Sequence, residues 1–413
     1  MTLATDPFGP ADHIEVEVLV IGSGAGGAPT AALLAEAGFT VLVVEEGDWV
    51  EQGSVKPFSL EQMATQYRSG GVTVAIGRPT VAYTEGRCAG GGTEVNSGLY
   101  KRPPHEVLTA WRDEYRIADL HLDEIDLIAD EVERDLSVSR VPGETTAASR
   151  ALARGAEALG WRNGEIPRWM TYPERGDAAS GQRQSMTVTY LPRAVAAGAH
   201  LATGIRVDHL EVVDGTARAA IVERPDGRRG RISFRHVFVC GGAIQTPALL
   251  QRSRIRGRIG ASLAVHPTVK LAARFREPIN VDDDVPVHQV TEFFPYTSFG
   301  GSASQAGLLA LALNDNWREF RSQITDWRRM SVYYAAITSE GRGRVQAVPG
   351  LRDPVVTYRL TRNDRALLGS GLGRLALAML AAGAEAVYPS FRGAPVVKRP
   401  ADVARLEIGR AHV

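Results

Sequence analysis

A glycine-rich hexapeptide near the start of the chain has the residue types and spacing of a phosphate-binding turn. In its GxGxxG pattern the first glycine allows a tight turn, the second lets backbone approach a pyrophosphate, and the third lets a helix pack closely. The helix N-terminus, with a partial charge of roughly +0.5, would receive the anion. Glu45 ends the next apolar run, where its carboxylate can accept hydrogen bonds from ribose hydroxyls. The pattern predicts a dinucleotide site at Gly22, Gly24, Ala25, Gly26, Gly27 and Glu45.

One alternative and one further expectation accompany this prediction. The hexapeptide could be a structural turn without a ligand. The neighbouring Glu46 is expected to point away from Glu45, because successive side chains of an extended strand face opposite sides.

A second glycine cluster, "EGRCAGGGTEVNSGLY", runs from residue 85 to residue 100. Three consecutive glycines cost conformational entropy. We therefore expect extended backbone lying against a flat or charged ligand, with a plain surface loop as the alternative.

The elements around the first cluster form a βαβ unit. Residues 16–21 and 41–44 are apolar and β-branched, as strands buried on both faces are. Residues 28–37 are small and apolar, which predicts a helix packed on the sheet, and Gly38 is its expected C-terminal stop.

The rest of the chain alternates between helical and strand patterns. The predicted elements are helices over most of 105–138, over 147–159, from 242 and over 362–384, hairpins over 199–240, and antiparallel strands over 270–360.

Composition excludes several classes of protein. The 47 basic residues balance the 47 acidic residues, so no net field attracts nucleic acid. The chain has no apolar stretch of 18 residues that would span a membrane, and no secretory signal. Cys88 and Cys240 have no metal-ligand spacing, so no metal is expected, and they fit a reducing, cytoplasmic compartment.

Four stretches together resemble the glucose-methanol-choline (GMC) flavoprotein oxidoreductases. They are residues 16–47, "GRCAGGGTEVNSGLYKRP" at 86–103, "VFVCGGAIQTPALLQRS" at 237–253 and "HPTVKLAARF" at 266–275. The resemblance implies an α/β fold: a Rossmann-type FAD-binding domain from a discontinuous chain, and an α+β substrate domain with an antiparallel sheet. The implied boundaries are 1–104 and 190–269 for the FAD-binding parts, 105–189 for a helical and loop region between them, and 270–407 for the substrate domain.

The same resemblance implies further flavin contacts. These are Arg87, Gly91, Gly92, Thr93, Asn96 and Ser97 in the second cluster, Val207 beside adenine, and Ala243 beside the ADP ribose. Some members attach the flavin through a histidine just before the asparagine of this cluster. Val95 occupies that position here, so FAD is expected to be non-covalent.

Three other positions depart from the pattern or invite comment. Ser253 is followed by Arg254 where the family has glycine, and we expect a locally different loop because arginine should not take glycine geometry. His266 precedes a proline and is expected to be structural. The aromatics of "TEFFPYTSFG" at 291–300 could line a substrate pocket or the core.

The reaction implied by the resemblance is hydride transfer from the CH–OH group of an alcohol to flavin N5, with a histidine as general base. The family carries that histidine near its C-terminus, beyond residue 413, so no catalytic residue is assigned here. Residues 408–413, "IGRAHV", can be back-translated into a sequencing adapter, and we expect them to be read-through. A lyase or decarboxylase on the same fold, and a non-catalytic dinucleotide-binding fragment, remain alternatives. The electron acceptor is open.

Overall fold

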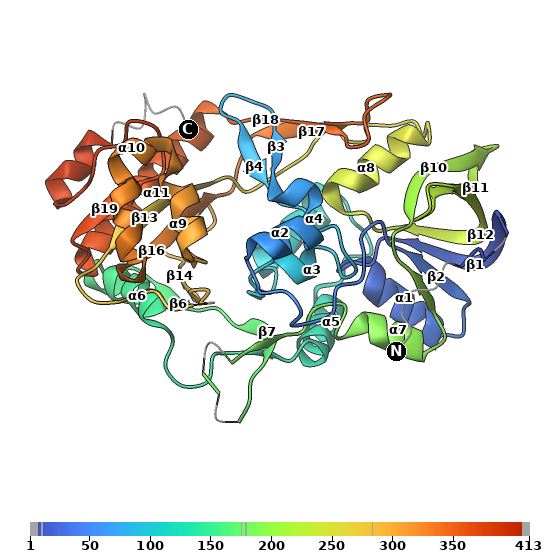
Figure 1. Ribbon diagram of the computed structural model, residues 1–413, viewed down its shortest axis with the longest axis horizontal. Coiled ribbons are helices and arrows are strands. Elements are labelled where there is room, and N and C mark those ends of the chain that lie inside the picture. Colours follow the sequence, from blue (N-terminus) through green and yellow to red (C-terminus); the bar gives the residue numbers. More distant parts are fainter. Residues whose placement is uncertain (1–6, 10, 175, 178–179, 283, 407–413) are drawn as a thin grey trace.

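The protein contains two six-stranded sheets at opposite ends of an elongated molecule (Figure 1). The computed structural model describes residues 7–9, 11–174, 176–177, 180–282 and 284–406. The expected read-through segment, 408–413, lies outside these residues.

The first sheet is mainly parallel and has the strand order β10-β11-β12-β1-β2-β9. β1 pairs in parallel with β12 and β2, β2 pairs in parallel with β9, and β10, β11 and β12 form an antiparallel meander. Its strands are β1 (His13–Ile21), β2 (Val41–Val44), β9 (His200–Ala202), β10 (Arg206–Val213), β11 (Thr216–Glu223) and β12 (Arg229–Val239).

Apolar side chains on both faces of β1 and β2 explain how this sheet is covered. Val18 and Val20 pack against α1 (Gly27–Glu36) and α7 (Tyr190–Ala196). Leu19 and Ile21 face the other way, toward the meander and α8 (Gly242–Arg252). The small residues of α1 let the helix lie close to the strands, as the sequence predicts.

The second sheet is antiparallel and has the order β19-β13-β16-β15-β14-β6. Its strands are β6 (Asn163–Glu165), β13 (Thr268–Arg274), β14 (His288–Val290), β15 (Thr297–Ser302), β16 (Met330–Ile337) and β19 (Ala386–Pro389). One face carries α6 (Ala147–Ala158) and α11 (Arg362–Ala381), and the opposite face carries α9 (Ala306–Leu313).

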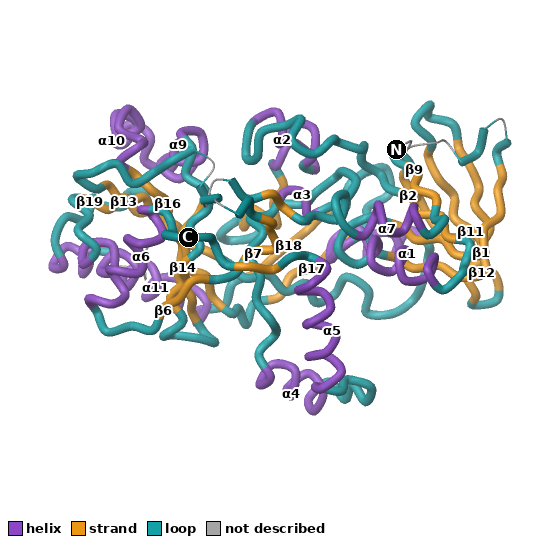
Figure 2. The backbone as a smooth tube through the Cα atoms, turned by 90° about the horizontal axis from the view of Figure 1, so that it is seen from below, coloured by secondary structure: helices purple, strands orange, loops and turns teal. Residues whose placement is uncertain are grey.

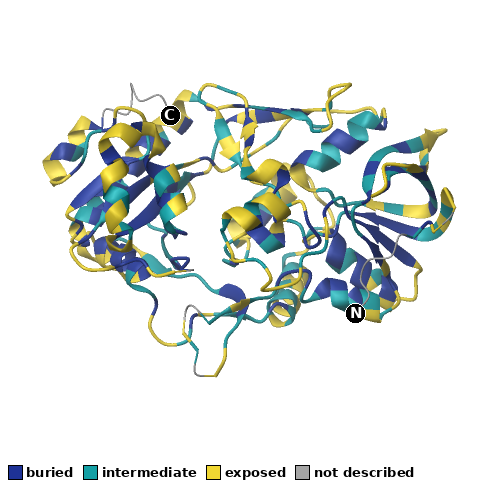
Figure 3. Cartoon of the chain, viewed as in Figure 1, coloured by how far each residue is buried: buried dark blue, intermediate teal, exposed yellow. Residues whose placement is uncertain are grey.

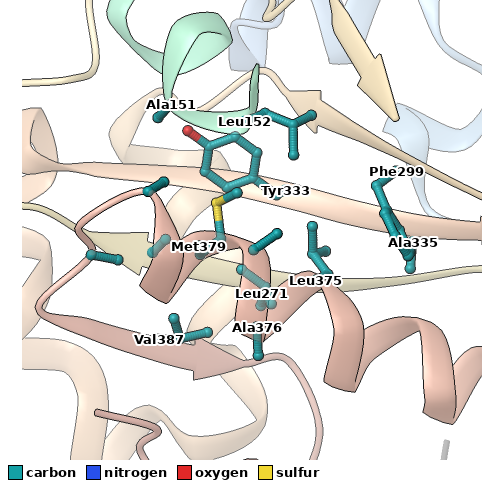
Figure 4. Packing of buried hydrophobic residues seen from close by; sticks show 14 of the residues in the cluster. Ala151, Leu152, Leu271, Phe299, Tyr333, Ala335, Leu375, Ala376, Met379 and Val387 are labelled. Carbon is teal, nitrogen blue, oxygen red and sulfur yellow. The ribbon is translucent and has the colours of Figure 1, made fainter. Parts of the chain in front are cut away.

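The largest core lies between this sheet and α11 (Figure 4). Leu271 and Tyr333 of the sheet pack against Leu375 and Met379 of the helix. The buried Tyr333 hydroxyl donates a hydrogen bond to the Ala148 carbonyl oxygen at 2.9 Å, so its polar atom is satisfied.

Shorter elements connect the two sheets. They are α2 (Leu60–Gln66), β3 (Thr73–Ala75), β4 (Val81–Tyr83), α3 (Gly92–Val95), α4 (His105–Glu114), α5 (Leu122–Asp135), β5 (Val138–Ser139), β7 (Arg168–Thr171), β8 (Gln182–Arg183), α10 (Trp317–Phe320), β17 (Arg342–Gln346) and β18 (Val355–Arg359). Figure 2 shows α4 and α5 projecting to one side, and Figure 3 shows burial concentrated in the two sheets and the helices on them.

The predicted fold class is confirmed. A mainly parallel sheet contains both the N-terminal βαβ unit and the strands from 200–239, and a separate antiparallel sheet follows. The domain boundaries stay a prediction. The structure adds that α6 and β6, from the region assigned to the space between the domains, belong to the second sheet and its core.

The expectation that Arg254 could not take glycine geometry is wrong. Its φ is +57°, in the left-handed region, at the second residue after the end of α8. Its N–H donates to the Gln251 carbonyl and the next N–H, of Ile255, donates to the Leu250 carbonyl. These bonds close the helix end and outweigh the steric cost of a side chain there.

Candidate functional site

A cavity of about 1360 Å³ extends from the carboxyl ends of β1 and β2 to the second sheet. Both glycine clusters line it at one end, and residues of β13, β16 and α9 line it at the other. Its volume exceeds the roughly 300–1,000 Å³ of a pocket for one small ligand, so it can hold a cofactor together with a substrate.

The glycines of the first cluster have different structural roles. Gly22 has φ +98°, and a Cβ there would lie 2.6 Å from the Cys240 carbonyl oxygen. A Cβ on Gly27 would lie 1.8 Å from the Gly22 carbonyl oxygen, so this glycine lets α1 start against the turn. A Cβ on Gly24 would meet its nearest protein atoms, in Gly90 and Gly91, at 3.9 Å. The fold therefore requires Gly22 and Gly27, whereas Gly24 keeps cavity space free.

The second cluster touches the first. Gly90 and Gly91 have positive φ, and a Cβ on Gly91 would lie 3.1 Å from the Gly24 Cα. The run is not extended, contrary to our expectation, because a left-handed turn leads directly into the single helical turn α3. The two glycine-rich turns thus meet at one wall of the cavity.

Glu45 is buried beside the first turn and accepts three hydrogen bonds. Ser23 donates to Oε2 from its N–H at 3.0 Å and from its hydroxyl at 2.7 Å, and the Gly47 N–H donates to Oε1 at 2.9 Å. Burial raises the pKa of Glu45, although these hydrogen bonds act in the opposite direction. The bonds hold the carboxylate at the edge of the cavity, where a ribose would have to approach it.

Glu46 also lines the cavity, so the expectation that it points away is wrong. β2 ends at Val44, and strand alternation does not continue past that residue. Arg68, which is buried, contacts the Glu46 carboxylate at 2.8 Å. Burial opposes ionisation of Glu46, but the hydrogen bond and charge of Arg68 outweigh it and lower the pKa.

The structure brings most of the predicted cofactor residues to this cavity. Those that line it are Gly22, Gly24, Ala25, Gly26, Glu45, Gly91, Gly92, Asn96, Ser97, Val207 and Ala243.

Three predicted residues do not line it. Gly27 lies behind the turn, and Arg87 lines a small separate pocket with Gly47. Thr93 is buried, where its hydroxyl donates to the Gly90 carbonyl at 2.7 Å and accepts from the Met186 N–H at 3.1 Å. Its side chain therefore stabilises the second cluster through hydrogen bonds and does not face the cavity.

Sequence reasoning missed several groups that line the cavity. Ser23 was assigned no role from the sequence. Glu85 begins the second glycine cluster and Lys270 lies in the stretch 266–275, but neither was assigned a role, and Arg68 lies outside the quoted stretches. The Glu85 Oε2 atom is buried without a hydrogen-bond partner in the part of the chain that the structure describes, and burial raises the pKa of this carboxyl.

The aromatic run at 291–300 belongs to the core and the surface. Phe293 and Phe299 pack with Trp161, at ring-centroid distances of 5.0 to 6.1 Å, and neither lines the cavity. Phe294 and Tyr296 are exposed. Of the two alternatives for this run, packing in the core describes the aromatic residues that are buried.

Three histidines differ in whether they line the cavity. His266 lines the cavity, and Pro267 beside it is buried. His105 contacts Asp126 on an exposed helix, and His288 lies on β14 outside the cavity lining. Within the described residues no cluster of three or more His, Cys, Asp or Glu side chains could hold a metal ion, and no helix has the length and apolarity to cross a bilayer.

Comparison with known proteins agrees with this geometry. The family profile described as GMC oxidoreductase matches residues 63–268. An uncharacterized GMC-type oxidoreductase of Sinorhizobium fredii is 39% identical over 391 residues, which cover 92% of this chain and 77% of the relative. The chain belongs to the GMC oxidoreductase family. It is therefore an oxidoreductase by family, and the cofactor of this family is a flavin.

More distant relatives extend the comparison. An uncharacterized GMC-type oxidoreductase of Mycobacterium tuberculosis is 32% identical, with 92% of this chain and 62% of the relative covered. A long-chain-alcohol oxidase of Arabidopsis thaliana is 27% identical, with 90% and 53% covered. The chain thus spans from about half to three quarters of the length of these relatives.

Solved structures share the fold at low sequence identity. Pyridoxine 4-oxidase from Mesorbium loti superposes with a TM-score of 0.65 at 16% identity, covering 96% of this chain and 86% of that one. Formate oxidase of Aspergillus oryzae RIB40 gives 0.66 at 12% identity, covering 97% and 87%.

Proposed function

We propose that this GMC oxidoreductase chain binds FAD non-covalently and serves an enzyme that oxidises the CH–OH group of an alcohol. The observation that supports the proposal most directly is the shared cavity. Both glycine-rich turns and the buried Glu45 line one end of it, and the second sheet lines the other. The activity is proposed for the whole protein that contains this chain.

The residues present fit the adenosine diphosphate part of the cofactor. The turn at Gly24 leaves the space that a Cβ would fill, and α1 begins directly after it, so free N–H groups are available to a pyrophosphate. Glu45 is already oriented by Ser23 for ribose hydroxyls. Val207 and Ala243 would lie along the same adenosine portion.

The second cluster would hold the flavin ring. Asn96 and Ser97 line the cavity after α3, and the Asn96 Oδ1 atom accepts from the Gly98 N–H at 2.8 Å, which fixes this segment. Val95 offers no nucleophilic atom for a covalent link to the ring. When bound, FAD would supply the hydride acceptor. The chain itself would orient the alcohol against the ring and exclude water from it.

The class of alcohol is supported by the far end of the cavity and by the relatives. Leu308, Leu311 and Ala312 of α9 line that end and give it an apolar wall. Relatives named long-chain-alcohol oxidases cover nine tenths of the chain. We propose an alcohol with a substantial apolar portion as the substrate.

The test is the colour of the purified protein. Bound flavin should give its two visible absorption bands, and acid precipitation should release the yellow chromophore into the supernatant. Colour that stays with the pellet would contradict non-covalent binding, and a protein that never takes up FAD would overturn the proposal. Anaerobic addition of 1-octanol to the whole protein that contains this chain should then bleach the bands.

A further inference from the structure

Lys270 is an unpaired cation on the second-sheet wall of the cavity. It lies on β13, and its side chain faces the cavity with no hydrogen bond or ion pair from the described residues. Burial lowers the pKa of its ammonium, and no carboxylate counteracts the shift. The side chain is exposed to the open space of the cavity, so a ligand that enters the cavity can reach its ammonium.

Its neighbours across the strands are polar as well. Lys270 pairs with Tyr334 of β16, and Tyr334 pairs with Gly300 of β15. A Cβ on Gly300 would lie 2.4 Å from the Tyr334 hydroxyl, so the ring lies across this glycine. The hydroxyl accepts from the Gln289 Nε2 atom of β14 at 3.2 Å, so it points away from β13 and Lys270, and Tyr334 does not line the cavity.

Ser390 extends the row on the opposite side. It follows the last residue of β19, and its N–H donates to the Lys270 carbonyl oxygen at 3.0 Å. The pairing of Leu271 with Pro389 makes Lys270 and Ser390 the next cross-strand pair, so their side chains share a face. The buried Ser390 hydroxyl has no hydrogen-bond partner in the described ranges, and Ser390 lines the cavity.

Part of this sheet face is apolar. Ala272, Val332 and Tyr388 pack beneath α9, and the polar row begins where that helix no longer covers the sheet. The cavity therefore places the Lys270 ammonium and the neighbouring Ser390 beside a leucine-lined wall.

We propose that Lys270 and Ser390 form a subsite for an anionic oxygen group, a carboxylate or a phosphate, carried by the alcohol substrate. The apolar portion of the same molecule would lie against Leu308 and Leu311 of α9. Hydrogen bonds from an ammonium to an anion are charge-assisted and therefore stronger than those between neutral groups. This inference rests on the proposed function, because it assigns the anion to the substrate of that enzyme.

Isothermal titration of the purified, flavin-loaded protein with octanoate, octyl phosphate and 1-octanol tests the subsite. Lys270→Met keeps the length of the side chain and removes its charge. It should weaken binding of the preferred anion by about 10- to 100-fold and change binding of 1-octanol by less than about threefold. Whichever of octanoate and octyl phosphate loses more affinity identifies the anionic group as a carboxylate or a phosphate. Lys270→Arg should retain much of the affinity, because it keeps the positive charge.

Lys101→Met is the matched control. The Lys101 ammonium lies 4.8 Å from the centre of the Phe294 ring, and Lys101 does not line the cavity, so anion binding should be unchanged. Equal anion affinities for the wild-type and Lys270→Met proteins would overturn the subsite, as would an equal loss in Lys101→Met. A protein that takes up no flavin but binds octanoate in a Lys270-dependent manner would contradict the proposed function alone.

Discussion

The Ser23 hydroxyl donates a 2.7 Å hydrogen bond to the Glu45 carboxylate and accepts a 3.1 Å hydrogen bond from the Gly90 N–H. One side chain therefore connects the first glycine-rich turn, the end of β2 and the second glycine cluster. Ser23 is fully buried, so water cannot replace these bonds without rearrangement. The glycine pattern assigns no role to this serine, yet its hydrogen bonds order the cofactor end of the cavity.

Ser23→Ala should destabilise the protein and weaken FAD binding. It leaves Glu45 and the Gly90 N–H each with one hydrogen bond fewer, which should lower the free energy of unfolding by about 1–3 kcal/mol. Denaturant unfolding and the quenching of flavin fluorescence would measure the two effects. Ser54→Ala is the control, because the exposed Ser54 hydroxyl also donates one bond, to the Glu51 carbonyl. An equal effect of both substitutions would show that Ser23 has no special connecting role.

Gly24→Ala should separate cofactor binding from folding. The added Cβ meets protein only at 3.9 Å, so the melting temperature of the flavin-free protein should be nearly unchanged. FAD affinity should fall by at least about tenfold, since the methyl group occupies the phosphate approach. Gly27→Ala is the opposite case: its Cβ would lie 1.8 Å from the Gly22 carbonyl oxygen, and we expect loss of the fold. Wild-type FAD affinity in Gly24→Ala would contradict the assigned phosphate position.

Asp284 should make stability fall as the pH rises. Burial raises the pKa of this carboxyl from 3.8 to about 6, although Thr146 and Arg168 act in the other direction. The folded state therefore binds more protons than the unfolded state between about pH 4 and pH 6, and the stabilisation present below pH 4 is lost across that window. Because of this group, the free energy of unfolding should fall by about 3 kcal/mol across that window.

Asp284→Asn should remove that part of the pH dependence and raise stability at pH 7.5 relative to the wild-type protein. Thermal unfolding at pH 4.5, 5.5, 6.5 and 7.5 gives the difference between the two proteins. Asp119→Asn, at an exposed position, should leave the profile unchanged. Parallel profiles for wild-type and Asp284→Asn proteins would rule out a raised pKa at Asp284.

Arg254→Gly should stabilise the protein. Arg254 is exposed and holds φ at +57° after α8, a conformation that glycine adopts without steric cost. The larger conformational entropy of glycine in the unfolded state offsets part of the gain. We therefore expect the free energy of unfolding, measured in urea, to rise by about 0.5–1 kcal/mol. Arg254→Ala keeps a Cβ and should bring no comparable gain. If alanine stabilises as much as glycine, the arginine side chain and not the backbone conformation is responsible.

Local and periodic features were predictable from the sequence. The strand–turn–helix unit at 13–44 follows from a buried apolar run, glycines at fixed spacing and a helix of small residues, all within one short segment. Glycine requirements at positions 22 and 27 follow from the same spacing, because backbone atoms of the turn itself would collide with a Cβ. The resemblance then gave the second glycine cluster its expected place.

Contacts between distant segments were decided only by the tertiary structure. Glu46 turns into the cavity because Arg68 lies there, and strand alternation says nothing beyond the last residue of β2. Lys270 and Ser390 become neighbours only because β13 and β19 pair, and cross-strand register depends on the packing of the whole sheet. Periodicity records which face of an element is apolar, but it carries no information on which polar residue of another element will stand opposite. The chemistry of the cavity wall therefore became visible only once the sheets were assembled.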